Sequence, residues 1–182
     1  MELPRFKYSP NAYEIDVFTE EEGICSICSV KRNLKYTGSF YSIEEPEYIC
    51  PWCINDGSVS KKYNGEFNDY SGIENVSPDP SIQSKINISE KHLLEVCERT
   101  PSYVSWQQEV WLTHCNEPCA FIGYANNKII EPFLDELKED IEVNIGYDPE
   151  LIRKYLTTDG SLVGYLFQCV NCGQHRLHAD SD

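Results

Sequence analysis

The sequence predicts an α+β protein in which zinc-ribbon-like β-hairpins and a few short helices are organised by two four-cysteine metal sites. Eight of the nine cysteines fall into four close pairs, and aromatic, strand-prone runs flank these pairs. Helical periodicity is confined to short segments. With 182 residues and 41% hydrophobic content, the chain can bury one sizeable core or two small lobes. We expect a zinc-ribbon lobe at 1–75 and an α+β lobe at 76–182, with a single compact domain as the alternative.

The first cysteine group has zinc-ribbon spacing. Cys25-x-x-Cys28 is followed after 21 residues by Cys50-x-x-Cys53, close to the spacing of two Cys-x-x-Cys pairs about 15 to 20 residues apart. The strand-prone runs "LKYTGSFYSI" and "EYI" between the pairs predict a hairpin with one knuckle at each end. Four thiolates at about 2.3 Å satisfy a tetrahedral zinc and leave no position open for a substrate.

The pair in "CPWC" also admits a redox interpretation. A redox dithiol requires a βαβ context and a helix that begins at the first cysteine. The residues that follow Cys53, "INDGSVSKKYNGEF", are typical of a loop because they are rich in Gly, Ser, Asn and Asp. We therefore expect structural zinc here, with a redox pair and simply buried cysteines as the two alternatives.

The second group joins two distant pairs. Cys115-x-x-x-Cys119 and Cys169-x-x-Cys172 are 49 residues apart, so their pairing is a tertiary inference. The Gly after Cys172 suits a tight knuckle, because Gly tolerates positive φ. We expect these four cysteines to bind a second zinc, with a site that includes His114, or no second metal, as the alternatives. If the four cysteines bind the metal, we expect His114 and Glu117 to lie next to the ligands without binding the metal themselves. Cys97 has no partner cysteine and is expected to be a small core residue.

The remaining elements follow from periodicity and capping. In "NISEKHLLEVCERTP" Ser89 is the expected N-cap and Pro101 the stop. "NKIIEPFLDELKEDIE" has apolar residues at helical spacing, and "DPELIRKYL" begins with Asp148 as N-cap and Pro149 at the first helical position. "SLVGYLFQC" and "HRLHADS" predict two strands around the last knuckle.

Two segments are harder to interpret. "FNDYSGIENVSPDPSI" is the best candidate for a linker. "YVSWQQEVWLTHC" fits a helix face or an alternating strand equally well. Its aromatic residues Tyr103, Trp106 and Trp111 could form a binding surface, but we favour a place in the core.

Composition limits the classes of partner. The chain has 15 basic and 30 acidic residues, a formal net charge of −15, which argues against nucleic acid as a partner. No signal peptide is visible, and no apolar run approaches the roughly 20 residues of a membrane span. We expect a cytoplasmic protein, where clustered thiols bind metal more often than they form disulfides. The acidic surface suits a protein partner, and a basic one in particular.

Catalytic motifs are weak. "HCNEPC" partly resembles the zinc deaminase signature, but Glu117 stands three residues after His114 and the second cysteine is misplaced. No H-E-x-x-H, P-loop, G-x-G-x-x-G or nucleophile-elbow sequence occurs. The alternative to a binding protein is a zinc-dependent enzyme that uses the second metal site with His114 and Glu117.

Several long motifs carry a family resemblance. They are "LPRFKYSP" (3–10), the Cys25/Cys28 pair, "YTGSFYSIEE" (36–45), "CPWCINDGS" (50–58), "RTPSYVSWQQEVWLTHCNEPCAFIGY" (99–124) and "GYLFQCVNCGQHRLHAD" (164–180). In these motifs the chain resembles the CbrC family of bacterial proteins. The resemblance implies a small zinc-bearing cytoplasmic protein and gives a weak pointer to bacteriocin tolerance.

These observations together predict a non-catalytic protein with two Zn²⁺ ions per chain. Its two four-cysteine sites would be structural, and its acidic surface would bind a macromolecular partner, with toxin tolerance or immunity as one such role.

Overall fold

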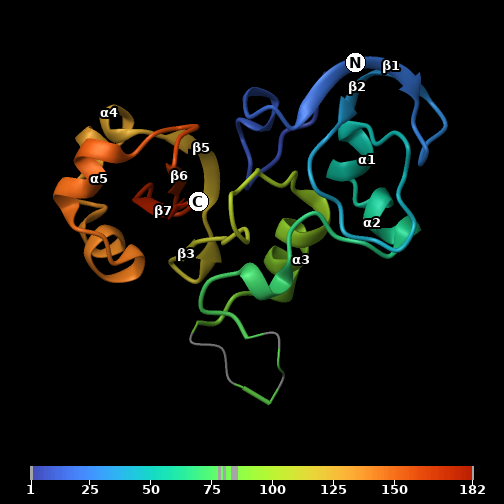
Figure 1. Cartoon of the computed structure of the whole chain (residues 1–182). Coiled ribbons are helices and arrows are strands. Elements are labelled where there is room, and N and C mark those ends of the chain that lie inside the picture. The colour runs from blue at the N-terminus through green and yellow to red at the C-terminus, as the bar shows by residue number, and fades with distance from the viewer. Residues whose placement is uncertain (1, 78, 80, 83–85, 182) are drawn as a thin grey trace.

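The computed structural model describes residues 2–77, 79, 81–82 and 86–181. Within these residues the chain forms short helices and three small antiparallel sheets (Figure 1). In chain order the elements are η1 (Ala12–Glu14), β1 (Phe18–Ile24), β2 (Lys31–Tyr36), α1 (Pro51–Asn55), α2 (Ser58–Tyr63), η2 (Tyr70–Gly72), α3 (Glu90–Arg99), β3 (Thr113–His114), β4 (Glu117–Pro118), β5 (Ala120–Ala125), α4 (Asn127–Ile130), η3 (Glu131–Phe133), the π-helix η4 (Asp140–Ile145), α5 (Pro149–Tyr155), β6 (Leu162–Gln168) and β7 (His175–Ser181). The mixed α+β class predicted from the sequence is therefore confirmed.

The N-terminal hairpin differs from the predicted ribbon. Strands β1 and β2 pair antiparallel from Phe18↔Tyr36 to Ile24↔Lys31, and the Cys25–Cys28 knuckle forms their turn. The expected strand at 34–43 ends at Tyr36, and beyond it only an isolated bridge joins Tyr41 to Glu66. The hairpin thus lies before the second cysteine pair and does not connect the two knuckles.

Helices replace the loop that was expected after the second knuckle. The residues 51–55 and 58–63 form α1 and α2, so the loop prediction is wrong. Pro51 occupies the first turn of α1, where its missing N–H costs no hydrogen bond. Gly57 and Asn64 have positive φ at the two ends of α2, so the turn-forming residues that suggested a loop instead delimit a helix.

Capping predicted two of the other helices. Helix α3 begins after Ser89, whose side chain accepts a hydrogen bond from the His92 N–H. Helix α5 begins after Asp148, whose side chain accepts from the Glu150 N–H. The helix expected at 127–142 is broken into α4, η3 and η4. Pro132, which cannot donate a backbone hydrogen bond, lies at the break between α4 and η3.

The C-terminal sheet has the order β5-β6-β7. Strands β6 and β7 pair from Leu162↔Ser181 to Gln168↔His175, which confirms the two strands predicted around the last knuckle. The short hairpin β3–β4 pairs Thr113 with Pro118 and His114 with Glu117, directly before β5. The β3–β4 turn and the β6–β7 turn, both of which carry cysteines, thereby lie in the same part of the molecule.

Two apolar clusters fill the interior. The larger cluster runs from Phe6 to Cys169, and the smaller one lies between β5–β7 and the segment 130–156. Phe67 and Ile73 are buried in the larger cluster, so the first half of the expected linker is packed, whereas positions 78 and 80 of its second half lie outside the described residues. The larger cluster combines residues from both sides of position 75, and the proposed two-lobe division stays a prediction.

The aromatic segment at 103–111 is irregular and divides its side chains between core and surface. Tyr103 and Trp111 are buried, as predicted, whereas Trp106 is 58% exposed. The Trp111 indole N–H donates to the Cys119 carbonyl oxygen, and the Tyr103 hydroxyl bonds both backbone groups of Val110. In Figure 1 the segment that follows α3 lies between the C-terminal sheet at one end of the molecule and β1, β2, α1 and α2 at the other. Within the described residues, no helix has the length and apolar character needed to cross a membrane.

Candidate metal centres

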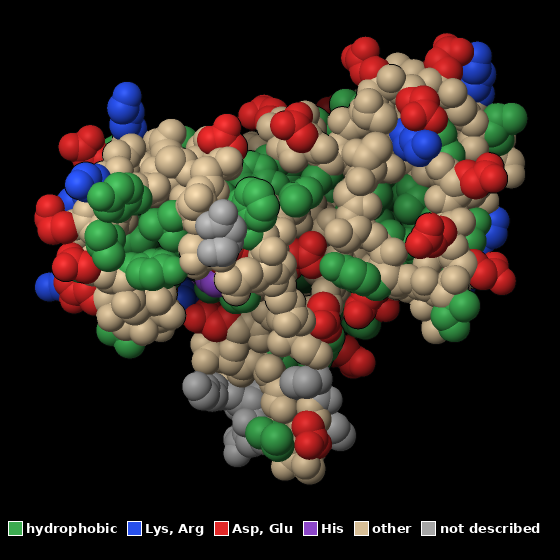
Figure 2. Space-filling view, in the orientation of Figure 1, with side chains coloured by type: hydrophobic (Ala, Val, Ile, Leu, Met, Phe, Trp, Pro, Cys, Tyr) green, Lys and Arg blue, Asp and Glu red, His purple; other side chains and the backbone are tan. Residues whose placement is uncertain are grey.

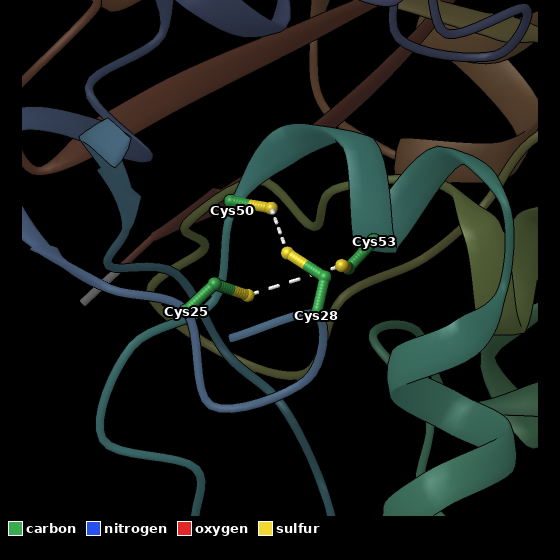
Figure 3. Close-up of side chains that lie close together, drawn as sticks. All are labelled: Cys25, Cys28, Cys50 and Cys53. Atoms are coloured by element: carbon green, nitrogen blue, oxygen red, sulfur yellow. Dashed lines mark hydrogen bonds between the residues drawn. The ribbon is translucent and has the colours of Figure 1, made fainter. Parts of the chain in front are cut away.

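The first group is a compact tetrad of sulfur atoms. Cys25, Cys28, Cys50 and Cys53 place their Sγ atoms within 4.8 Å of one another, and the side chains point to a common centre (Figure 3). The Cys25–Cys53 and Cys28–Cys50 sulfur distances are 3.8 and 4.0 Å. Sulfurs bound at about 2.3 Å to a tetrahedral zinc lie about 3.8 Å apart, whereas disulfide sulfurs lie about 2.05 Å apart. The spacing fits a metal tetrad and not two disulfides.

Local backbone structure positions these sulfurs. Cys25 and Cys28 lie in the tight β1–β2 turn, where the Cys25 N–H donates to the Val30 carbonyl and the Ser29 N–H to the Cys25 carbonyl. Cys50 is the N-cap of α1, and the Cys53 N–H donates back to its carbonyl oxygen at 3.1 Å. The two Cys-x-x-Cys pairs therefore face each other from a turn and from the start of a helix.

The charge balance of this group favours a bound cation. A hydrogen bond from Cys50 lowers the pKa of Cys25 to about 4, and the same contact raises the pKa of Cys50. Burial raises the pKa of Cys53 to about 12. Four thiolates this close repel one another, and a divalent cation removes that cost.

Basic groups lie beside the first group. Lys62 donates a 2.6 Å hydrogen bond to the Ser26 carbonyl of the knuckle. The Arg32 guanidinium lies 4.1 Å from the centroid of Trp52, which stands between Cys50 and Cys53. Four thiolates and one Zn²⁺ carry a net charge of −2, so these cations compensate the charge of an occupied site.

The second group differs from the predicted quartet. It consists of His114, Cys115, Cys169 and Cys172, whose ligand atoms also lie within 4.8 Å of one another. The His114 Nδ1 is 3.3 Å from the sulfurs of both Cys115 and Cys172, which are 3.8 Å from each other. The site that includes His114, the alternative left open by the sequence, is the one that the structure assembles.

Cys119 is not part of the second group, and the hairpin explains why. The Cys119 N–H donates to the Leu112 carbonyl, so Cys119 lies opposite Leu112. Leu112 is two residues before His114, which corresponds to about 7 Å along an extended chain at about 3.4 Å per residue. Cys115 lies in the turn itself. The Cys119 side chain is fully buried in the larger core, and burial raises its pKa. The prediction of Cys119 as a metal ligand is therefore corrected to a core residue.

The turn that holds Cys115 is strained. Cys115 and Asn116 have φ values of 53° and 56°, the left-handed conformation of a two-residue hairpin turn. Such values are costly for Cys, whereas Asn adopts them more readily, and they recur at functional sites. On the opposite side, Gly173 adopts φ 79° directly after Cys172, and its N–H donates to the Cys169 carbonyl. The positive φ expected at this Gly is observed.

Glu117 anchors the second knuckle without entering the ligand group. Its carboxylate pairs with Lys7 and accepts hydrogen bonds from the Tyr8 hydroxyl at 3.0 Å and the Asn171 amide at 2.9 Å. Burial acts to raise the pKa of Glu117, but the hydrogen bonds from Lys7, Asn171 and Tyr8 outweigh it, so this pKa lies below its ordinary value. Because Asn171 lies between Cys169 and Cys172, this ionised carboxylate fixes the loop that carries both sulfurs.

A partly buried ion network, which the sequence did not predict, lies beside the second group. Arg176 forms a bidentate pair with Asp140, pairs with Glu74 at 2.9 Å and donates to the Thr113 carbonyl. Next to it, a cavity of about 360 Å³ is lined by acidic and amide side chains and by His114. The partners are 36 and 102 positions away in sequence, so no local pattern could have revealed the network.

Comparison with known proteins shows where the chain belongs. The model of the uncharacterised protein family UPF0167 matches residues 3–181. The chain is 34% identical to a UPF0167 protein of Mycobacterium bovis over 184 residues, which cover 98% of this chain and 93% of that protein. It is 35% identical to a UPF0167 protein of Pseudomonas aeruginosa over 186 residues, with 99% and 97% covered. No solved structure matches the chain.

These matches bear on the resemblance found in the sequence. An uncharacterised bacterial family was expected and is confirmed, whereas the CbrC name stays a prediction. The match to the family model spans both candidate metal centres, since it runs from residue 3 to residue 181. The chain belongs to the UPF0167 family.

Proposed function

We propose that this protein binds two Zn²⁺ ions and that the metal-stabilised fold presents an acidic surface to a basic protein partner. The observation that supports it best is the presence of two groups of four potential ligands, each within 4.8 Å. One group offers four thiolates and the other three thiolates and an imidazole. These are the donor sets and the tetrahedral geometry that zinc prefers.

Both zinc ions would have a structural role. The first would tie the β1–β2 turn to α1, and the second would tie the β3–β4 turn to the β6–β7 turn. Each group supplies four ligands and so closes the coordination sphere without a position for water. A non-catalytic role follows from this closure.

Zinc K-edge X-ray absorption of the purified protein tests the closed coordination. Seven sulfurs and one nitrogen shared between two ions predict an average of 3.5 sulfur and 0.5 nitrogen scatterers per zinc, at about 2.3 and 2.0–2.1 Å. A larger share of light-atom ligands would indicate a bound water and contradict the closed second site.

An acidic groove supports the partner part of the proposal. Two adjoining hollows of about 520 and 260 Å³ share Tyr41 and Glu66, and the carboxylates of Asp69, Glu98 and Glu109 also line them. Among the described residues, no Lys or Arg side chain lines either hollow. On the face shown in Figure 2, acidic side chains are spread over the whole surface, whereas most basic ones lie toward the two ends. A cationic segment complements such a groove.

The carboxylates of the groove are crowded and bordered by exposed apolar side chains. Burial raises the pKa of Glu66 and of Glu109, and the charge of Asp69 adds to both shifts. Val104 and Trp106, on the segment that forms one wall, are 59% and 58% exposed. Arg or Lys side chains of a partner would relieve the repulsion and could stack on the indole ring. A basic toxin domain is one such partner: the acidic charge favours a basic partner, and the CbrC resemblance points weakly to bacteriocin tolerance.

A labelled peptide in which Arg alternates with Ala tests this surface by fluorescence anisotropy. We expect the double variant Glu66→Gln/Glu109→Gln to bind the peptide about tenfold more weakly, since two partly exposed ion pairs are lost. The control Glu131→Gln/Glu142→Gln removes the same charge from exposed positions elsewhere. Equal weakening in the two variants would show that only net charge matters, and would contradict the groove as the binding surface.

A zinc-dependent enzyme is the second candidate. The observation that favours it is the cavity of about 360 Å³ against His114, lined also by Glu136 and Glu139. Glu117, the predicted acid–base group, is held by Lys7, Tyr8 and Asn171, which argues against a catalytic role for it. A water ligand in the X-ray absorption measurement would favour this candidate over a structural site.

A further inference from the structure

The two candidate metal centres differ in the exposure of their sulfurs. In the first group Cys25, Cys50 and Cys53 are buried, and Cys28 is exposed. In the second group both Cys115 and Cys172 are exposed, whereas Cys169 is buried. Thiolate sulfurs that solvent reaches are the ones that soluble oxidants attack. The second group therefore offers two reactive sulfurs together, and the first offers one.

The two exposed sulfurs are adjacent. The Sγ atoms of Cys115 and Cys172 lie 3.8 Å apart, so a disulfide bond of about 2.05 Å requires a closure of under about 2 Å. Both residues belong to turns, Cys115 between β3 and β4 and Cys172 between β6 and β7. Turn residues can make a movement of this size without breaking the strand pairing of either hairpin.

We propose that Cys115 and Cys172 form an oxidation site at which a hydroperoxide, such as hydrogen peroxide, converts the second metal centre into a disulfide and releases its zinc. The inference rests on the proposed function, since the released ion is the zinc of that centre. It adds a reactivity that the structural role does not include.

The chemistry proceeds in two displacement steps. One thiolate attacks the peroxide, so that an S–O bond forms, the O–O bond breaks and hydroxide leaves. The second thiolate attacks the resulting sulfenic sulfur, so that the S–S bond forms and a second hydroxide leaves. Two protons convert the hydroxides to water. The two sulfurs lose two electrons in total, and the peroxide gains them.

Loss of the metal follows from the ligand count. After oxidation only His114 and Cys169 remain to hold the ion, whereas a structural zinc requires four ligands. The first group keeps its ion, because three of its four sulfurs are buried. A dithiol reductant would reverse the disulfide and restore the site.

The test treats the zinc-loaded full chain with a small excess of hydrogen peroxide. A chromophoric chelator measures the zinc released, and mass spectrometry of non-reduced peptides maps the disulfides. We expect the loss of one of two zinc ions per chain, in step with a Cys115–Cys172 disulfide. The variant Cys97→Ala/Cys119→Ala removes the two cysteines outside both groups and should behave in the same way.

Three results would overturn the proposal. They are release of both ions at the same rate, a Cys169–Cys172 disulfide in place of Cys115–Cys172, and retention of both ions after peroxide treatment. The zinc content before treatment distinguishes a failure of the oxidation proposal from a failure of the proposed function. A chain with fewer than two ions at the start contradicts the proposed function, and its disulfide map still tests the oxidation site.

Discussion

His114 and Cys119 are five positions apart in sequence, but their surroundings differ. The His114 ring lies among the sulfurs of the second group, whereas the Cys119 side chain is fully buried in the larger apolar cluster. The cysteine pairs are visible in the sequence, and so is the knuckle around Cys169 and Cys172. The choice of His114 over Cys119 depends on a two-residue turn at Cys115 and Asn116 with positive φ, a conformation that Asn favours but Cys does not. The adjacent positions of His114 and Cys115 were the available signal, because a two-residue turn can direct both side chains to one centre.

Zinc stoichiometry separates these two residues. We expect His114→Ala to lose one zinc per chain, because three thiolates do not complete the second site. Cys119→Ala should keep two zinc ions and lose only about 1 kcal/mol of stability, since it removes one small buried group. Elemental analysis of both variants checks this. Loss of a zinc from the Cys119 variant alone would reverse the assignment.

Glu117 gives the second group a pH-dependent anchor. Its folded-state pKa lies below the ordinary value, so it stabilises the protein above the unfolded pKa of about 4.3. This contribution is lost as the pH falls through the folded-state pKa. We expect the stability difference between wild type and Glu117→Gln to be full near neutral pH and to vanish in acid.

Denaturant unfolding of wild type and Glu117→Gln at several pH values measures that difference. Both proteins lose zinc-dependent stability when the thiolates are protonated, so the comparison isolates the carboxylate. A difference that stays constant from neutral to acid pH would show that Glu117 acts without its charge.

At the scale of elements, capping signals were more reliable than loop composition. Ser89 and Asp148 were correctly predicted to start α3 and α5 through their side chains. The segment after Cys53 was predicted to be a loop because its Gly and Asn residues suggested one. Two of these residues, Gly57 and Asn64, instead stand at the two ends of α2. The burial of Val59 and Ser60 against the rest of the fold stabilises this short helix, and such tertiary packing is absent from a local pattern.

A comparison of Ala substitutions at two glycines with positive φ distinguishes the cost of backbone strain from an effect on metal binding. Gly173 and Gly146 have φ of 79° and 73°, so Ala at either position costs about 1–2 kcal/mol. Gly173 follows Cys172, whereas Gly146 ends η4 and an added Cβ there meets nothing within 4 Å. We expect Gly173→Ala also to weaken zinc binding at the second site, and Gly146→Ala to leave it unchanged, in a chelator competition assay. Equal zinc affinity in the two variants would contradict a role of the knuckle conformation in metal binding.

At the scale of the whole molecule, Arg176, whose side chain is 12% exposed, joins the two apolar clusters. Arg176 adjoins Leu177 of the smaller cluster and pairs with Glu74, which follows Ile73 of the larger one. Asp140 completes the network from the helical side. The two cysteine groups could be predicted from spacing, but this connection could not, because its members are remote in sequence and look like ordinary surface charges.

The network predicts an unequal cost for two arginine substitutions. Arg176→Met should destabilise the fold by about 3 kcal/mol or more, because it leaves the Asp140 carboxylate buried and unpaired. Arg153→Met removes an exposed pair with Glu150 and should cost less than about 0.5 kcal/mol. Chemical denaturation of the two variants measures the contrast. Similar costs would mean that the buried network adds nothing to stability.

Native mass spectrometry of the full chain tests the central claim most directly, namely that two closed groups each hold one zinc ion. We predict a main species with two zinc ions per chain, from the seven cysteines and one histidine of the two groups. A chain that binds no zinc, or only one ion when zinc is supplied in excess, would contradict the account.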